Sequence, residues 1–586
     1  MSFTDQCDIY CAVHENGINR LIARAMRFFP SFFNYGSPFV CAHPRLWCSA
    51  VNADASVAPS GDRLMTSVPL SLPATVNLPM NIKPIIPDFC AQLTALAIDF
   101  FPGNAITPPA SFPALSSRQF GLKATVQAGL SCPNLPKEAE VLNCFSIDIF
   151  GEIAFSQSSP TKWLAPRLVD FDIQGVGPDG LKAFLDCYAI FITNQALDYI
   201  GALINGAAAA PYEMKNLYGT VSLSISPSSV GNNPVFQDDQ VKLFADLSGV
   251  TINEVIGPSG STTPGSKLAP AVSHVQRTRP SSGPSDLTVA ISQSVFAKIF
   301  GAMLSGGVVL EVPTPPWPTP PPPNGWGLIG NSKNFGYLYF KVKASLQSGI
   351  VSLQNNGTVL IKDLEISWDT LEFTVNFNIP TVGPFGVGDL KIGPFFGNNP
   401  DISIPIVLSG DFSTKVSAVA RPVIYYGQGD INTPNCPNRW QLYLVPQLPL
   451  FVMPIEINAK FIDAVIQGVK KAFQAAHIPD EATDIVIEAI KAADGAFQGF
   501  DTTAESLLDA FFNGIGSQMG ITRQLDNMLY DYFANKAPLF ELPDPLRLSL
   551  ADKNTHRPAN TLAVPIDYLG VSVNARELVI EGDIGA

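Results

Sequence analysis

The hydrophobic pattern repeats one local motif four times along the chain. Each copy has an apolar residue, then a Ser, Thr, Asn or His, and then apolar residues at helical spacing; the copies begin at Val13, Ile192, Ile291 and Ile457. Such a pattern predicts a strand end, a polar N-cap and an amphipathic helix. The copies at Val13 and Ile291 align without a gap. Two copies in each half of the chain indicate an internal duplication.

The first helix is predicted over residues 14–29 and ends before Pro30. Its apolar residues lie at i, i+3, i+4, i+7, i+8 and i+11, which forms one continuous face. His14 is expected to serve as the N-cap rather than as a catalytic base. The helix that follows Ile291 is predicted to carry the same kind of face.

Long segments of alternating apolar and polar residues separate these helices. Alternation with a period of two predicts strands of a sheet that buries one face. The main predicted strands span residues 66–72, 120–128, 145–155, 167–173, 218–226, 240–247, 250–255, 287–291, 337–345, 349–355, 358–366, 371–379, 402–408, 413–424, 440–445, 546–550, 561–564 and 571–581.

Two kinds of segment divide the chain. Residues 257–267 and 278–285 are rich in Gly, Ser, Pro and Thr, and they predict loops at a joint between two halves. Residues 313–323 predict a polyproline II segment, which could act either as a rigid connector or as a ligand for an aromatic groove.

The order of elements in each half is a helix, many strands, a helix and more strands. A parallel α/β fold would alternate strands and helices throughout, and a sandwich would not place an amphipathic helix at each end of a strand set. A long, curved antiparallel sheet that wraps around helices fits this order.

Three stretches resemble the TULIP superfamily, which includes the bactericidal/permeability-increasing (BPI), lipopolysaccharide-binding and cholesteryl-ester-transfer proteins and the bacterial P-forty-seven and OrfX proteins. The segment 8–13 before the first helix is similar to the start of P-forty-seven-type proteins. The segment 287–292 with its helix is similar to the start of the second BPI barrel. The C-terminal pattern, residues 537–543 and then 571–582, is similar to the end of that family.

The resemblance implies an α+β fold of two tandem elongated TULIP/BPI-like domains. In each domain a long, highly curved antiparallel sheet wraps around amphipathic helices. We expect an N-terminal domain over 1–229, central strands and a linker over 230–286, and a C-terminal domain over 287–586, with extra helices at about 481–534.

The composition indicates either an unusually large core or an apolar surface kept for a ligand or partner. The chain is 46% hydrophobic and only 15% charged, against about 25% charged in typical soluble domains. The net charge of −14 argues against nucleic acid and against lipopolysaccharide. Arg20, Arg24 and Arg27 form a local basic spot that is expected to be a solvated helix face.

The resemblance implies lipid binding or lipid transfer, with acyl chains or another apolar ligand in a groove between sheet and helices. The candidate groove residues are the apolar stripes of the two aligned helices: Ile18, Leu21, Ile22, Met26, Phe296, Ile299, Phe300 and Met303. The same stripes could instead fill the core. The alternative function is a TULIP-like scaffold or interaction component of a toxin or secreted complex without lipid transfer, with a protein partner. A third reading is membrane contact through Phe28–Phe33, which could otherwise form a plug under the first helix.

The sequence predicts no enzyme and no cofactor. None of the five His lies in an HExxH or HxxxH frame, and no GxSxG or phosphate-binding glycine motif occurs. The segment 170–175 resembles a calcium loop but lacks its closing Glu, so it is expected to be a strand end and a turn.

The nine Cys show no zinc spacing and are expected to be mainly buried thiols, with Cys144 and Cys187 as one pair that could approach. Because no secretory signal or membrane-spanning helix is predicted, a cytoplasmic location or release by a non-classical route is expected.

Overall fold

A computed structural model describes about half of the residues of the chain. The described residues are 2–43, 64–67, 88–131, 143–156, 165–175, 190, 212–216, 219–229, 233–253, 273–280, 283–305, 308–311, 334–345, 350–378, 401–429, 437–447, 467, 470, 471, 474, 484, 534, 538–550 and 560–585.

The described part is mainly strand with a few helices, as expected for an α+β fold. The helices are α1 (Glu15–Phe28), η1 (Pro30–Phe32), α2 (Pro38–Ala42) and α4 (Gln293–Ser305). The strands before α4 are β1 (Ile9–His14), β2 (Asn34–Gly36), β3 (Thr66–Ser67), β4 (Asp88–Phe100), β5 (Gln119–Ser131), β6 (Asn143–Ser156), β7 (Ala165–Gln174), β8 (Tyr212–Asn216), β9 (Gly219–Pro227), β10 (Val235–Gln237), β11 (Gln240–Asn253), β12 (Ser273–Val275) and β13 (Leu287–Ser292). The strands after α4 are β14 (Val308–Glu311), β15 (Asn334–Ser345), β16 (Ile350–Leu353), β17 (Val359–Asn378), β18 (Asp401–Gln428), β19 (Asn438–Pro446), β20 (Phe540–Asp544), β21 (Leu546–Leu550), β22 (Asn560–Val564), β23 (Ile566–Val573) and β24 (Glu577–Ile584).

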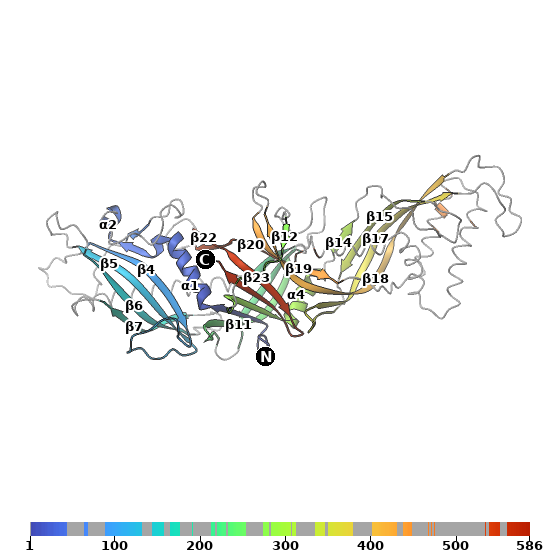
Figure 1. The fold of residues 1–586 in the computed structure, drawn as a ribbon. Helices are drawn as coiled ribbons and strands as arrows, with labels where there is room; N and C mark the ends of the chain where they lie inside the picture. The colour runs from blue at the N-terminus through green and yellow to red at the C-terminus, as the bar shows by residue number, and fades with distance from the viewer. Residues whose placement is uncertain are drawn as a thin grey trace.

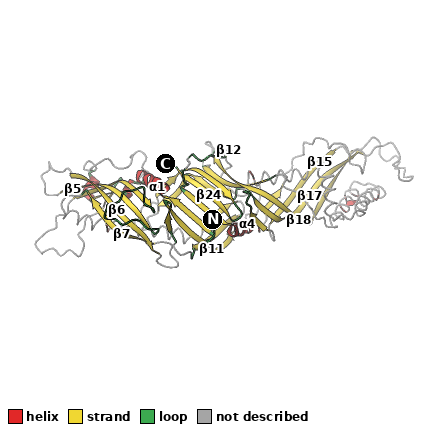
Figure 2. Cartoon of the chain, turned by 60° about the horizontal axis from the view of Figure 1, so that its bottom comes forward, coloured by secondary structure: helices red, strands yellow, loops and turns green. Residues whose placement is uncertain are grey.

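Three large sheets follow one another along an elongated molecule (Figures 1 and 2). The sheet β3-β2-β4-β5-β6-β7 lies at one end, and the sheet β14-β15-β17-β18-β19-β20 extends to the other. Between them lies a central sheet in the order β23-β24-β13-β1-β11-β9-β8. The described strands pair antiparallel, except for the parallel pair β2 and β3. The long strands curve strongly (Figure 1).

The central sheet joins the two halves of the chain through β1 and β13. These strands pair antiparallel, and Cys11 lies opposite Val289. In the ungapped alignment of the two helix-opening motifs, each residue of β1 corresponds to the residue 278 positions later, so Cys11 and Val289 are also equivalent in sequence. A pair of equivalent residues that face each other places a local two-fold axis between them.

Hydrogen bonds repeat on both sides of this axis. The amide of His14 donates to the carbonyl of Asp286, and that of Ser292 donates to the carbonyl of Asp8, both at 2.9 Å. The Asp8 carboxylate accepts from the Leu247 amide, and the Asp286 carboxylate accepts from the Ile584 amide, at 3.0 and 2.8 Å.

The neighbouring strands β11 and β24 follow the same symmetry. The amide of Asp8 donates to the carboxylate of Asp246, and the amide of Asp286 donates to that of Asp583. The sequence-level duplication therefore corresponds to a two-fold arrangement of β11-β1 and β24-β13.

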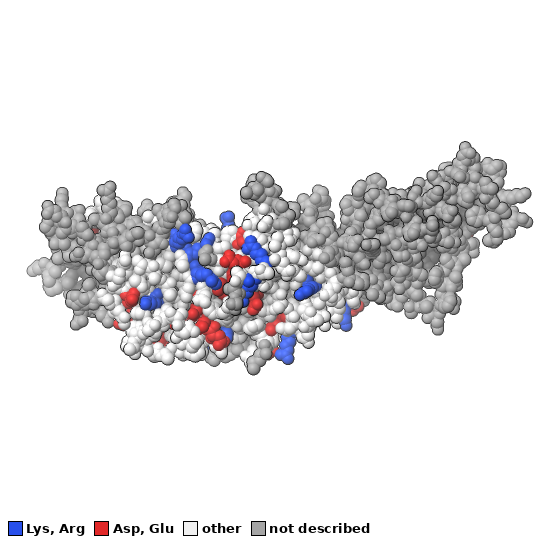
Figure 3. Space-filling model, in the orientation of Figure 1, with Lys and Arg blue, Asp and Glu red and all other residues white. Residues whose placement is uncertain are grey.

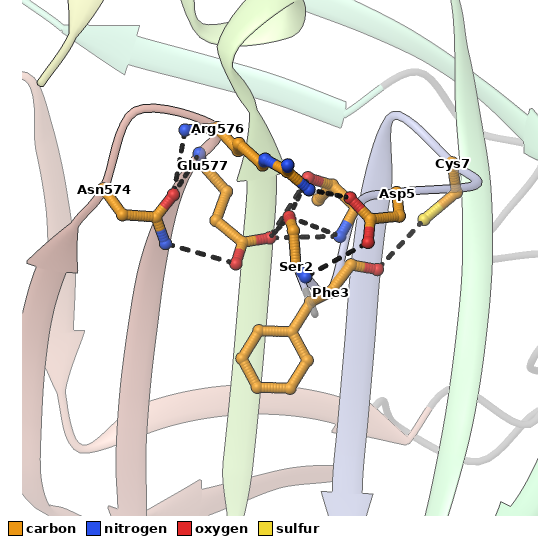
Figure 4. A network of polar contacts seen from close by, with 8 residues as sticks. Ser2, Phe3, Asp5, Cys7, Asn574, Arg576 and Glu577 are labelled. Atoms are coloured by element: carbon orange, nitrogen blue, oxygen red, sulfur yellow. Dashed lines mark hydrogen bonds and ion pairs between the residues drawn. The ribbon is translucent and has the colours of Figure 1, made fainter. Parts of the chain in front are cut away.

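The N-terminal segment is fastened to the β23–β24 hairpin (Figure 4). Glu577, which is only 2% exposed, accepts hydrogen bonds from the Ser2 hydroxyl at 2.6 Å and the Thr4 amide at 3.0 Å. Arg576 forms an ion pair with Asp5 at 2.9 Å. Burial of Glu577 tends to raise its pKa, but the hydrogen bonds from Ser2, Thr4, Asn574 and Phe3 together outweigh burial, so the pKa is lowered.

Most predicted strands that fall on described residues are present, with three kinds of difference. The strands β2, β4, β8, β10, β12, β14 and β20 were not predicted. The predicted pairs 240–247/250–255, 358–366/371–379 and 402–408/413–424 are the single strands β11, β17 and β18. The single strand predicted over 571–581 is wrong, because the Asn574 side-chain oxygen accepts from the amides of Arg576 and Glu577 and turns the chain between β23 and β24.

Several predictions lie outside the described residues. They are the motifs at Ile192 and Ile457, the polyproline segment 313–323, the side chains of Cys144, Cys187 and Met303, and all but two positions of the extra helices at 481–534. The boundaries after residues 229 and 286 stay a prediction. Among the described residues, no helix combines the length and the hydropathy that crossing a bilayer requires.

Candidate functional site

The sheet β4–β7 carries one continuous apolar face. The register and the alternation of side chains place these residues on the same side: Ala91, Leu93, Leu96, Ile98 and Phe100 of β4, Phe120, Leu122, Ala124, Val126 and Ala128 of β5, Ile147, Ile149, Gly151, Ile153 and Phe155 of β6, and Leu168, Phe171 and Ile173 of β7. From Phe120 to Ala128 this face is roughly 27 Å long. One lipid tail occupies about 15 Å, half of a bilayer core.

The opposite face of the same strands is polar. Gln119, Lys123, Thr125 and Gln127 of β5 point to it, and Lys123 lies 3.9 Å from the carboxylate of Asp148 on β6. The sheet is therefore amphipathic across its thickness. Its apolar face is the face that needs a cover.

Four phenylalanine rings close the end of the apolar face near the middle of the molecule. This aromatic wall consists of Phe100, Phe120, Phe155 and Phe236. The Phe155 and Phe236 rings stack at 5.5 Å, and the Phe100 and Phe236 centroids lie 5.1 Å apart. Phe236 comes from β10 and is 1% exposed. The wall was not predicted, because its members lie on four strands that are distant in the sequence.

Several side chains in the middle of the apolar face remain partly exposed. Leu93, Leu96, Ile98, Leu122 and Phe171 are all only partly buried. A packed core normally removes such side chains from water almost completely. The far end is sealed again by a buried cluster of Val126, Ile147 and Ile173.

A glycine interrupts the apolar face in β6. Gly151 lies opposite Leu122 on one side and Phe171 on the other. A Cβ there would meet the Leu168 side chain at 3.6 Å, an ordinary contact. Glycine inside a strand often marks a close approach of a ligand or of another backbone.

Helix α1 closes the edge of β4 next to the aromatic wall. The His14 ring accepts a hydrogen bond from the Asn16 amide at 3.2 Å, which confirms the predicted N-cap. The Asn19 side chain exchanges two hydrogen bonds with the backbone of Ile98, and Glu15 accepts from the Phe100 amide at 2.8 Å. Side chains of α1 thus take the place of a neighbouring strand.

The predicted groove residues of α1 lie in different surroundings. Ile18 packs against the aromatic wall, whereas Leu21 packs against Leu562 and Val564 of the β21–β22 hairpin. Ile22 is half-buried and Met26 is buried. Of these four residues, only Ile18 is placed in the cluster at the end of the apolar face, and whether the stripe lines a groove stays a prediction.

The predicted groove residues of α4 belong to the other half. Phe296, Ile299 and Phe300 are buried, and the two phenylalanine rings stack at 5.9 Å. Met303 lies in α4, but its side chain is outside the described part. The two stripes therefore sit on separate helices on either side of the central sheet, and their role in a groove also stays a prediction.

The basic spot on α1 is not simply a solvated face. Arg20 forms an ion pair with the buried Asp286, which directly precedes β13, and Arg24 donates to the carbonyl of Ala563 in β22. Figure 3 shows basic and acidic side chains intermingled over the described middle of this face. Arg20 and Arg24 thus join the first helix to the second half of the chain.

The Phe28–Phe33 segment forms a plug rather than an exposed loop. Phe29 is 1% exposed and contacts Leu562 and Val564, and Phe28 and Phe32 pack against the same cluster. Membrane insertion through this segment does not agree with its burial. The calcium-loop lookalike is, as predicted, the end of β7 followed by Gly175 at a φ of 83°.

Two titratable groups at the start of α1 have shifted pKa values. Burial raises the pKa of Glu15 to about 7, with Asp239 and Asp99 adding to the shift and the Phe100 amide opposing it. Burial also lowers the pKa of His14. Within the described part, no group of three or more His, Cys, Asp or Glu could hold a metal ion.

Comparisons with known proteins do not identify a family for this chain. No family model matches the sequence, and a search of curated proteins gives no match. Among solved structures, the chain is matched to a crystal structure of lipopolysaccharide binding protein, at 9% identity and a TM-score of 0.22, over 99% of each chain. A TM-score this low does not establish a common fold.

Proposed function

We propose that this chain binds acyl chains or another apolar ligand along the apolar face of β4–β7, beside helix α1. The observation that carries the proposal is the set of partly exposed apolar side chains in the middle of that face, between the aromatic wall and the Val126 cluster. The apolar face is longer than one lipid tail, and Gly151 carries no side chain near its centre. Such a face can hold a tail without any fixed polar group.

The free energy of such binding comes from the apolar surface area that the ligand removes from water. Each methylene moved out of water contributes roughly 0.8 kcal/mol, so a tail of about a dozen methylenes gains roughly 10 kcal/mol. Association costs about 4–15 kcal/mol, so a single tail is held weakly and a two-tailed lipid well. We propose binding or transfer, not catalysis, because this chemistry needs no reacting residue.

We also propose the two-domain TULIP arrangement. It is supported by the two-fold relation of β1-α1 and β13-α4 and by a curved antiparallel sheet on each side of the central sheet. In this proposal Phe296, Ile299, Phe300 and Met303 line a second ligand site, equivalent to the one beside Ile18, Leu21, Ile22 and Met26.

The alternative is an interaction component whose sites are filled by its own side chains. The observation that favours it is the cover over Leu21, Ala25 and Phe28 by the β21–β22 hairpin. In this alternative the chain contacts a protein partner rather than a lipid ligand or a membrane surface.

Mass spectrometry of an organic extract of the purified protein tests the proposal. Stoichiometric lipid or fatty acid, retained through gel filtration and exchanged into acceptor vesicles of phosphatidylcholine, is the expected result. An extract without lipid, together with failure to take up lipid from donor vesicles, would favour the alternative.

A further inference from the structure

The two halves of the central sheet differ in charge at equivalent positions. Glu15, the first residue of α1, corresponds to Gln293, the first residue of α4. The amide of Glu15 donates to the carbonyl of Asp239, and the amide of Gln293 donates to that of Arg576. Two acidic residues in the first half therefore occupy the positions of a neutral and a basic residue in the second.

Both first residues hold a helix against a sheet edge. The Gln293 amide group donates to the carbonyl of Val351 at 2.8 Å, and its oxygen accepts from the Leu353 amide. Glu15 accepts from the Phe100 amide, but an ionised carboxylate cannot donate. In the first half the donor is Asn19, at the position where the second half has Ala297.

The Glu15 carboxyl group has acidic neighbours and little water. Its residue is 3% exposed, and Asp239 lies in the turn before β11 with its Oδ1 atom buried and without a hydrogen-bond partner in the described part. Asp99, at the end of β4, is satisfied by the amides of Asn104, Ala105 and Ile106.

The charged groups on the surrounding elements interact with residues other than Glu15 and Asp239. Arg20 pairs with Asp286, which directly precedes β13, and Lys242 of β11 pairs with the exposed Asp238. His14 uses its ring as the N-cap of α1. Among the described residues, none of these cations forms an ion pair with Glu15 or Asp239.

We propose that Glu15 and Asp239 form a proton-operated latch between helix α1 and strand β4. With a proton on the Glu15 carboxyl group, α1 stays docked on the β4 edge. Loss of this proton leaves the buried Glu15 carboxylate near the partly buried carboxylate of Asp239 and loosens the contact. The equivalent contact of α4 with β16 depends on Gln293, which does not titrate, so that contact does not change with pH.

The direction of the effect follows from linkage. A raised pKa in the docked state, from 4.5 to about 7, means that the undocked state gives up its proton more easily. Docking is therefore fully stable below the ordinary pKa of a Glu, weakens as pH rises toward 7, and stays weak above it. The latch is closed in acid and loosened at neutral pH.

Hydrogen exchange resolved by mass spectrometry tests the latch on the full chain. After correction for the intrinsic exchange rate, protection at Ile98–Phe101 is expected to fall about 50-fold between about pH 5 and about pH 7.5. Protection at Ile350–Leu353 is expected to stay constant. Equal pH dependence at both edges, or none at either, would overturn the proposal.

Two variants complete the test. Glu15→Gln, which copies the residue of the second half, is expected to abolish the pH dependence at Ile98–Phe101. Glu152→Gln removes another buried carboxyl group, 1% exposed, from the same sheet and is expected to leave it intact. The proposal is wrong if Glu15→Gln keeps the wild-type pH dependence or if Glu152→Gln removes it. If a variant does not fold, the proposal is still tested by the wild type, in which the pH dependence of protection at Ile98–Phe101 is compared with that at Ile350–Leu353.

Discussion

Cys11 of β1 lies opposite Val289 of β13, and the two residues hold the same position in the repeated motif. This pair relates the two halves by a local two-fold axis. The same hydrogen bonds recur on both sides through Asp8 and Asp286. A substitution in one half can therefore be compared with the substitution of the equivalent residue in the other half.

The two equivalent aspartates, Asp8 and Asp286, are expected to contribute differently to the free energy of unfolding. Asp286 is 3% exposed and holds both the Ile584 amide and Arg20, whereas Asp8 is half-buried and holds the Leu247 amide. We expect Asp286→Ala to destabilise the protein by roughly 3 kcal/mol and Asp8→Ala by about 1.5 kcal/mol. Urea unfolding followed by intrinsic fluorescence measures both. An equal loss, or a larger loss in Asp8→Ala, would contradict this order.

Two helix glycines are expected to respond in opposite directions to the same substitution. A Cβ on Gly17 of α1 would lie 2.9 Å from the Asp286 Cβ, so Gly17→Ala must push the helix away and should cost roughly 1–3 kcal/mol. Gly301 of α4 has no atom of the described structure within 4 Å of its Cβ position. There, alanine should stabilise the helix by about 0.5–1 kcal/mol.

Differential scanning calorimetry checks both glycine variants. The thermal midpoint should fall for Gly17→Ala and rise for Gly301→Ala. A rise for Gly17→Ala would show that α1 does not approach β13 as closely as described.

The N-terminal contact with Glu577 should be lost in acid. Because hydrogen bonds from Ser2 and Thr4 lower the pKa of this carboxyl group, the contact is fully formed above the ordinary pKa of a Glu. It weakens as pH falls through the lowered pKa. We expect residues 2–8 to lose exchange protection in this acid range, and Glu577→Gln to lose it already at neutral pH. Glu581→Gln, an exposed neighbour on β24, should have no effect; equal effects of both variants would speak against the contact.

The fold was predictable where the apolar pattern is local. Helix α1 with its His14 cap, β5, β6 and β13 all follow from periodicity and a polar residue at the boundary. The split between β23 and β24 was missed because it depends on a single side chain, Asn574, that bonds to the backbone. Local patterns do not weigh such a contact against continued alternation.

The site was less predictable because it depends on register. The face that unites Leu93, Leu122, Ile149 and Phe171 exists only when four strands align, and β4 itself was not predicted. Of the seven predicted groove residues whose side chains the structure describes, Ile18 is the one in the aromatic-wall cluster. The central two-fold pairing of β1 with β13 was equally hidden, although the repeated Asp before each strand was visible in the sequence.

Two glycines on adjacent strands allow the proposed ligand face to be tested directly. Gly151 of β6 faces the apolar side, and Gly121 of β5 faces the polar side, where its Cβ would meet only ordinary contacts at 3.8 Å. Valine suits a strand at both positions. Gly151→Val fills the apolar face, whereas Gly121→Val adds the same side chain to the other face of the same sheet.

The decisive measurement is a fluorescence titration of wild type and both variants with cis-parinaric acid, displaced by saturated fatty acids of increasing length. We predict saturable binding by the wild type, a loss of affinity of roughly tenfold or more in Gly151→Val, equivalent to about 1.4 kcal/mol, and wild-type affinity in Gly121→Val. Absence of binding by the wild type would contradict the proposed function itself. Binding that is unchanged in Gly151→Val, or weakened equally in both variants, would show that the ligand does not lie on the apolar face of β4–β7.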